Sequence, residues 1–122
     1  MQLLNDIIIY MQLPHKDNAV IKREKLTKYL LNLLHPVGGA KAKFFRRIGF
    51  SNTNVEIFEQ ELYRIGKNDH VADQKSSEDS SGINYIIIGS IFAPNGNLYS
   101  IETIWYIKIG TQNPSFITAY PV

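Results

Sequence analysis

Residues 34–50, LHPVGGAKAKFFRRIGF, decide how the rest of this chain is arranged. The segment begins with a His-Pro turn and a Gly-Gly pair. It continues as a short helix from residue 39 to Gly49, a residue typical of a left-handed helix cap. Lys41 and Lys43 lie near the start of that helix. We expect a preceding helix to pack against it and a following sheet to form the other wall of a groove.

The size and composition of the chain predict one domain. It has 122 residues, 44% of them hydrophobic, which is enough for a single core over residues 1–122. It contains no cysteine, which excludes a thiol nucleophile, thiolate metal ligands and disulfides. The longest apolar run, residues 7–11, is too short to cross a membrane, and the N-terminus lacks a signal-peptide pattern. We therefore expect a cytoplasmic protein.

The net charge of +2 is distributed unevenly along the chain. Residues 16–47 carry nine Lys or Arg side chains and two acidic ones, whereas residues 48–122 carry four basic and eight acidic side chains. Clustered Lys and Arg displace counterions from phosphates, so the basic half suggests a polyanion such as nucleic acid as a partner. An acidic protein would suit the same surface, and a solvated helix face would need no partner at all.

Three helices are predicted in the first half of the chain. Apolar residues recur at helical spacing over residues 20–34, where Pro36 ends the first helix. The second helix covers residues 39–49. Thr53 and Glu56 form a capping-box pattern that begins a third helix, which Gly66 ends. The apolar positions are Leu26, Tyr29, Leu30, Leu33 and Leu34 in the first helix, and Val55, Phe58, Leu62 and Ile65 in the third.

The second half of the chain reads as a sheet. Residues 67–82 are polar and show no periodicity, so they are predicted to form a long loop. Three segments then show the composition and alternation of strands, and Asn95-Gly96 predicts a hairpin between the first two. The predicted strands are residues 83–92, 98–109 and 116–120.

These elements predict an α+β fold class. About three N-terminal helices, in a helical half over residues 20–66, pack on a C-terminal antiparallel sheet of three to four strands within residues 83–121. Residues 6–13 fit a strand or a short helix equally well.

The first candidate site is the segment that begins the second helix. If this helix starts at residue 39, the backbone N–H groups of Gly38 and Gly39 are free to meet a phosphate. Lys41 would supply a positive charge, and His35 could exchange protons near neutral pH. Residue types alone favour a structural interpretation, in which a His-Pro turn and two glycines shape the start of the helix.

The second candidate site lies on the last predicted strand. Thr118 and Tyr120 share one face, where their hydroxyls could bind a phosphate or orient a base, although hydroxyl residues are common in strands for packing reasons. Trp105 is most simply a core residue, and its alternative role is a platform for base stacking. The histidines at positions 15, 35 and 70 show no metal-ligand spacing, so no metal or other cofactor is expected.

Three separated motifs resemble an uncharacterised bacterial domain family. They are HPVGGAKAKFF at 35–45, TIWYI at 103–107 and ITAYP at 117–121, in the order of a signature HPxGxxKAxxF, TxWxI and ITAYP. The family occurs as small stand-alone proteins and as a module of polymorphic toxins. The resemblance, which covers most of residues 13–121, implies a toxin that is paired with a small antitoxin-like protein.

The layout is also similar, at the superfamily level, to the barnase–EndoU–colicin–RelE group of ribonucleases. That similarity implies metal-independent RNA cleavage, in which the ribose 2′-hydroxyl attacks the adjacent phosphate. It implies that His35 is the general acid or base, that Lys41 holds the phosphate and that Thr118 or Tyr120 positions it. The other expected RNA contacts are Gly38, Gly39, Lys43, Arg46, Arg47 and Trp105.

An alternative function fits the same residues. A non-catalytic nucleic-acid-binding or protein-interaction module, paired with a small neighbouring protein, would need the basic half of the chain. It would not need His35, Lys41 and Thr118 to be arranged around one phosphate.

Overall fold

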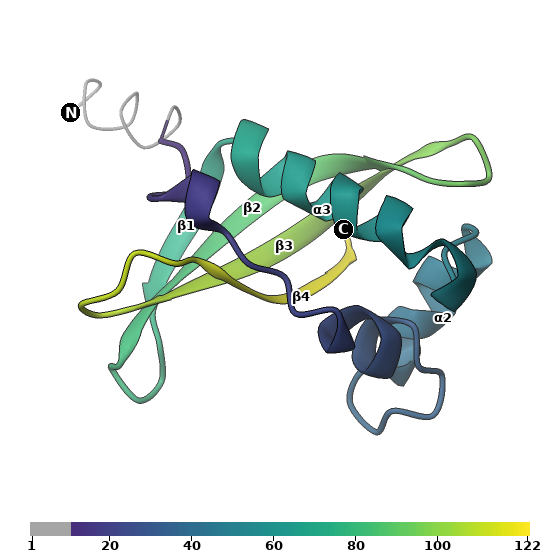
Figure 1. The fold of residues 1–122 in the computed structure, drawn as a ribbon, viewed down its shortest axis with the longest axis horizontal. Coiled ribbons are helices and arrows are strands. Elements are labelled where there is room, and N and C mark those ends of the chain that lie inside the picture. The colour runs from purple at the N-terminus through teal and green to yellow at the C-terminus, as the bar shows by residue number, and fades with distance from the viewer. Residues whose placement is uncertain (1–10) are drawn as a thin grey trace.

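In the computed structural model, which describes residues 11–122, four antiparallel strands form one sheet in the order β1-β2-β3-β4. Helix α3 (Val55–Asn68) lies along one face of this sheet, and helix α2 (Gly39–Arg47) lies beyond its β4 side (Figure 1). The predicted α+β fold class is therefore confirmed. The strands are β1 (Val71–Ser76), β2 (Gly82–Phe92), β3 (Leu98–Lys108) and β4 (Ser115–Pro121). The element predicted at residues 6–13 lies largely outside the described residues.

The core lies between α3 and the sheet. The four apolar positions predicted for the third helix are all buried, which confirms that stripe. The face of β3 that meets them carries Ile101, Thr103 and Trp105, all fully buried. The helical spacing of α3 and the alternation of β3 thus face each other across one apolar layer.

Trp105 belongs to this core and not to a surface. Its side chain is 0% exposed, and its indole N–H donates to Thr103 Oγ1 at 2.9 Å. Its ring packs edge-on against Phe116, with 5.3 Å between the ring centroids. The expectation that Trp105 stacks on an RNA base is wrong, because no face of the indole is accessible.

The first helix is much shorter than the predicted range of residues 20–34. Residues 24–30 are helical, and most of them form η2 (Leu26–Leu30), a π-helix in which the Leu31 N–H donates to the Leu26 carbonyl at 2.8 Å. Asn32 ends the helix: its amide donates to the Lys28 carbonyl, and its oxygen accepts the Leu34 N–H. Local hydrogen bonds of this kind compete with helix propagation.

This early end changes which apolar residues reach the core. Leu26 and Leu30 are buried as predicted, but Leu33 and Leu34 are 50% and 91% exposed. Upstream of the helix, Val20 forms a parallel bridge to Ser115 at the start of β4. The segment before η2 is therefore extended along the sheet edge.

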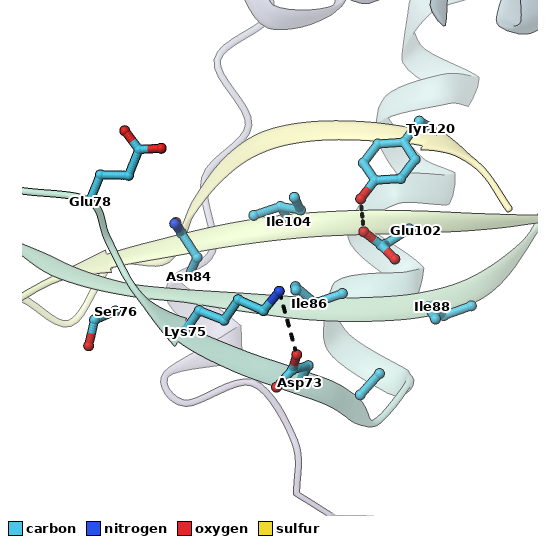
Figure 2. A pocket seen from close by; sticks show the side chains of 11 residues that line it. Asp73, Lys75, Ser76, Glu78, Asn84, Ile86, Ile88, Glu102, Ile104 and Tyr120 are labelled. Carbon is cyan, nitrogen blue, oxygen red and sulfur yellow. Dashed lines mark hydrogen bonds and ion pairs between the residues drawn. The ribbon is translucent and has the colours of Figure 1, made fainter.

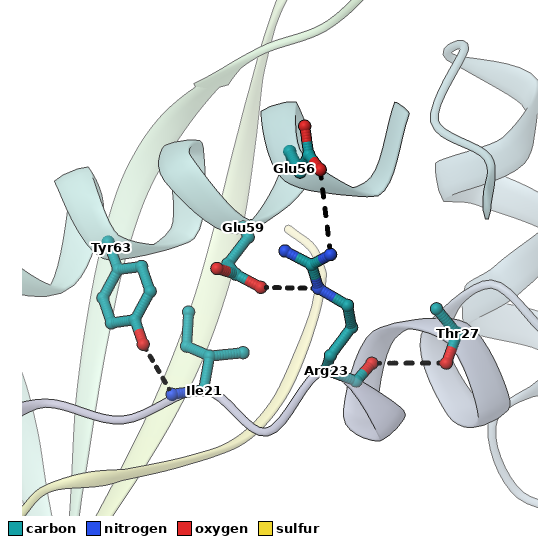
Figure 3. A network of polar contacts seen from close by, with 6 residues as sticks. All are labelled: Ile21, Arg23, Thr27, Glu56, Glu59 and Tyr63. Carbon is teal, nitrogen blue, oxygen red and sulfur yellow. Dashed lines mark hydrogen bonds and ion pairs between the residues drawn. The ribbon is translucent and has the colours of Figure 1, made fainter. Parts of the chain in front are cut away.

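Polar contacts hold this extended segment against α3 (Figure 3). The Ile21 N–H donates to the Tyr63 hydroxyl at 2.9 Å, and Arg23 Nε donates to Glu59 Oε2 at 3.2 Å. Arg23 also pairs with Glu56 at 3.9 Å. Exposed ion pairs contribute only about 0–1 kcal/mol, so their main effect here is to position η2 next to α2 and β4.

The capping box before α3 uses different residues from those predicted. Ser51 Oγ accepts the Thr53 N–H, and Asn54 Oδ1 accepts the Ser51 N–H at 2.7 Å, within the short helix η3 (Asn52–Asn54). Thr53 and Glu56 do not form the box. Ser51 is the N-cap, two residues after Gly49, whose φ of 113° is typical of a residue that follows a helix end.

The prediction of a long loop over residues 67–82 is also wrong in part. Helix α3 continues past Gly66 to Asn68, and the edge strand β1 follows it. Among the strand residues only Val71 is buried, and the other five side chains are exposed. Backbone pairing with β2 holds β1 in place, so the side chains carry no alternating pattern from which a strand could be predicted.

We expect Gly66→Ala to destabilise the protein, although alanine is the better helix former. A Cβ at this position would lie 2.6 Å from the Trp105 ring, and overpacking a core costs about 1–3 kcal/mol. Chemical denaturation measures the change. The control is Gln60→Ala on the exposed side of the same helix, which should change the free energy of unfolding by less than about 0.5 kcal/mol. A stabilised Gly66→Ala variant would contradict the close packing of Gly66 on Trp105.

Glu61 connects α3 to the end of β2. Its Oε1 accepts the Phe92 N–H and an Arg64 N–H, both at 2.8 Å. Burial raises the pKa of Glu61, but the hydrogen bonds from Arg64 and Phe92 outweigh it, so the pKa lies below its ordinary value of 4.5.

This depressed pKa predicts a pH dependence of stability. The contribution of Glu61 is present above the pKa of the unfolded chain and is lost as the pH falls through the lower pKa of the folded state. Between about pH 5 and pH 3, wild type should therefore lose more free energy of unfolding than Glu61→Gln, by under about 1 kcal/mol. Equal slopes for the two proteins in denaturation at several pH values would contradict this.

Candidate active site

Lys41 of α2 lies within a cluster of hydroxyl groups. Its Nζ donates to the Tyr29 hydroxyl at 2.8 Å and to Thr118 Oγ1 at 3.2 Å. The Tyr29 and Thr118 hydroxyls are themselves 3.0 Å apart. We call Tyr29, Lys41 and Thr118 the Lys41 cluster. It joins η2, α2 and β4 at a single ammonium group.

Tyr29 is the member of the cluster that the sequence analysis assigned to the core. Burial raises its pKa, but hydrogen bonds with Lys41 and Thr118 and the positive charges of Lys41 and Lys25 outweigh this effect. The pKa of Tyr29 therefore lies below its ordinary value of 10.0. The only sequence signal was a phenol among leucines, with lysines one and four residues before it.

Tyr120 contacts the cluster through its ring. Lys41 Nζ lies 5.6 Å from the centroid of the Tyr120 ring, a distance at which a cation is attracted to an aromatic face. The Tyr120 hydroxyl points the other way and donates to the Glu102 carboxylate (Figure 2). Tyr120 and Glu102 line a hollow of about 590 Å³ on the sheet face opposite α3.

His35 lies next to the cluster and uses one ring nitrogen to shape its own loop. Its Nδ1 accepts the N–H groups of Val37 and Gly38 at 3.0 and 2.9 Å. Its ring packs edge-on against Tyr29, with 5.0 Å between centroids. An Nδ1 that accepts two N–H groups carries no proton, so the neutral imidazole carries its proton on Nε2.

Gly38 and Gly39 have no free N–H group for a phosphate. The Gly38 N–H binds His35 Nδ1, and the Gly39 N–H binds the His35 carbonyl at 2.9 Å. A Cβ on Gly39 would lie 2.8 Å from the Leu33 carbonyl oxygen, and one on Gly38 would overlap the Tyr29 ring. The two glycines are required for close packing, so the expected phosphate cradle is wrong.

A groove of about 700 Å³ lies beside the cluster. Tyr29, His35 and Thr118 line it and so bring together residues from three parts of the chain. The rest of its wall is mainly basic and apolar and consists of Lys22, Glu24, Lys25, Lys28, Val37 and Ile117. This volume falls within the roughly 300–1,000 Å³ of small-molecule sites.

The other basic residues expected to bind RNA lie on α2. Lys43, Arg46 and Arg47 are exposed, and Arg46 donates to the Leu31 carbonyl at 3.2 Å. Over residues 11–122, no group of three or more His, Asp or Glu side chains is placed to hold a metal ion. Within the same range, no helix is long and apolar enough to span a membrane.

We expect the hydrogen bonds that His35 Nδ1 accepts to stabilise the protein. His35→Ala removes the acceptor for two backbone N–H groups and should lower the free energy of unfolding by about 1 kcal/mol. His35→Asn should restore most of this loss, because an asparagine oxygen also accepts N–H groups two and three residues ahead. Thermal and chemical denaturation measure both changes. Equal stability of wild type and His35→Ala would show that the cap contributes nothing.

Comparisons with known proteins identify a family for this chain and a solved structure with a similar fold. Residues 12–122 match the family described as Domain of unknown function (DUF6883). No curated protein sequence matches the chain. The fold is similar to one chain of the "Contact-dependent growth inhibition toxin - immunity protein complex from Klebsiella pneumoniae 342", with a TM-score of 0.64 and 15% identity over 88% of this chain and 96% of that one. At this identity the likeness concerns the fold alone. The match over residues 12–122 shows that the chain belongs to the DUF6883 family.

Proposed function

We propose that the chain is the toxin of a toxin–partner pair and that it cleaves RNA without a metal ion. In this reaction the ribose 2′-hydroxyl attacks the adjacent phosphate, which leaves a 2′,3′-cyclic phosphate and a 5′-hydroxyl. The observation that supports it best is the Lys41 cluster: Tyr29 and Thr118 line a basic groove, and their hydroxyls both accept hydrogen bonds from the ammonium group of Lys41.

The cluster has the chemistry that a developing phosphorane charge requires. An ammonium group held by neighbouring hydroxyls is already oriented when negative charge accumulates on the phosphate oxygens. Lys41 would bind one of these oxygens, Thr118 would donate its hydroxyl proton to a second, and the Nε2–H of His35 would donate to the same phosphate. The Tyr120 ring would hold the Lys41 chain in place.

The basic residues of the groove and of α2 would bind the phosphates of the RNA strand that flank the cleaved bond. Lys22, Lys25 and Lys28 line the groove and would contact the phosphates on either side of the cleaved bond. Lys43, Arg46 and Arg47 of α2 would extend this contact along the backbone. Cleavage by the 2′-hydroxyl explains why the substrate is RNA, since DNA lacks the attacking group.

A cognate protein partner is part of the same proposal. A toxin needs an inhibitor in the cell that makes it, and a solved structure with a similar fold is a toxin–immunity complex. Leu34 and Val37 are 91% and 70% exposed beside the basic groove. An acidic partner with an apolar centre would cover these side chains and neutralise the lysines, and so exclude RNA.

The test is incubation of the purified protein with total bacterial RNA in the presence of a metal chelator. We expect cleavage products with cyclic phosphate ends, and no cleavage of the same sequence as DNA. Lys41→Met should lower kcat/KM at least about 100-fold, because it removes a charged donor to the transition state. Induced expression of the wild-type protein alone should slow bacterial growth, and Lys41→Met should relieve this effect.

The matched control is Lys108→Met, which removes an exposed lysine at the end of β3, away from the groove. It should leave cleavage and growth inhibition unchanged. Salt-dependent RNA binding without any cleavage would reject the enzyme and support the non-catalytic binding module. Absence of both cleavage and binding would reject RNA as the partner.

A further inference from the structure

RNA cleavage of this kind requires a group that accepts the 2′-hydroxyl proton, and the structure argues against His35 as that group. His35 Nδ1 is occupied by the N–H groups of Val37 and Gly38. Its Nε2 already carries the proton of the neutral ring and so accepts no other. A proton on Nδ1 would point at the N–H groups of Val37 and Gly38 and would remove both hydrogen bonds that shape the loop. His35 therefore serves as a hydrogen-bond donor.

The hydroxyl of Tyr29 is the better-placed proton acceptor. It lies 2.8 Å from Lys41 Nζ and 3.0 Å from Thr118 Oγ1, and its residue lines the groove. Lys41 donates to this oxygen, so the geometry favours the phenolate form. An oxygen that receives hydrogen bonds from an ammonium group is stabilised when it loses its own proton.

The charges around Tyr29 also favour its phenolate form. Lys41 Nζ is 5.4 Å and Lys25 Nζ is 5.8 Å from the centroid of its ring. Lys22 and Lys28 line the same groove, Glu24 is the one acidic side chain in that lining, and His35 meets the ring edge. These groups are consistent with the lowered pKa of Tyr29 described above.

We propose that Tyr29, paired with Lys41, is the group that accepts the 2′-hydroxyl proton, and that His35 donates a hydrogen bond to the phosphate but transfers no proton. This inference rests on the proposed RNA cleavage. The Tyr29 phenolate takes the proton of the 2′-hydroxyl as that oxygen forms its bond to phosphorus. The bond from phosphorus to the 5′ oxygen breaks, and the leaving oxygen takes a proton from the Lys41 ammonium. A proton then passes from Tyr29 to the Lys41 amine, which restores the phenolate and the ammonium.

The pairing of Tyr29 with Lys41 can be tested without RNA. The ultraviolet absorbance of tyrosinate, followed against pH in the folded protein, reports the seven tyrosines together. We expect a component that ionises below pH 10, that Tyr29→Phe removes and that Lys41→Met moves to higher pH. Tyr99 is the internal control: hydrogen bonds from Asn97 and Asn95 also lower its pKa, but Lys41 does not contact it. A titration curve that Tyr29→Phe leaves unchanged in this range would overturn the inference.

The kinetic test separates the proton transfer from RNA binding. Wild-type kcat should rise with pH as Tyr29 ionises, and Tyr29→Phe should lower kcat at least about 100-fold, abolish this rise and leave RNA affinity nearly unchanged. Tyr99→Phe is the matched control, since it removes a hydrogen-bonded phenol oxygen on β3 outside the groove. His35→Asn should retain the pH dependence of wild type.

The outcomes distinguish this inference from the proposed function. An active Tyr29→Phe protein with the pH profile of wild type would overturn the role of Tyr29 and leave RNA cleavage standing. A pH profile that changes in His35→Asn but not in Tyr29→Phe would return the proton transfer to His35. An inactive wild-type protein would overturn both the proposed function and the inference.

Discussion

The ammonium group of Lys41 is the constraint on which the candidate site depends. A partly buried cation is costly unless hydrogen-bond acceptors surround it, and here Tyr29 and Thr118 supply the oxygens. These acceptors come from segments almost ninety residues apart in the chain. The hydrogen bonds therefore fix the position of η2 and α2 at the β4 side of the sheet. The contacts of Arg23 and Tyr63 with their partners support the same placement from the side of α3.

The loop before α2 serves this arrangement. His35 closes the loop by accepting two backbone N–H groups, and Gly38 allows the Tyr29 ring to lie directly against it. The residues that looked like a phosphate cradle thus shape the surroundings of a phenol. In the proposed reaction, Tyr29 and Lys41 carry the proton transfers that the sequence suggested for His35.

The helices and strands with strong periodicity could be predicted from the sequence, and the ones held by backbone contacts could not. The spacing of Val55, Phe58, Leu62 and Ile65 predicted α3 because each of these side chains reaches the core. β1 was missed because it buries only Val71 and depends on pairing with β2. The first helix was predicted too long because the hydrogen bonds of Asn32 end it before Leu33.

The sequence by itself determined the α+β class, the order of helices before strands, and the concentration of positive charge in residues 16–47. These properties follow from local spacing and composition, which need no knowledge of distant contacts. Tertiary structure alone decided that Tyr29 joins Lys41 and Thr118 and that Trp105 is enclosed. Each of these depends on which distant segment lies against the residue, and residue type does not specify that neighbour.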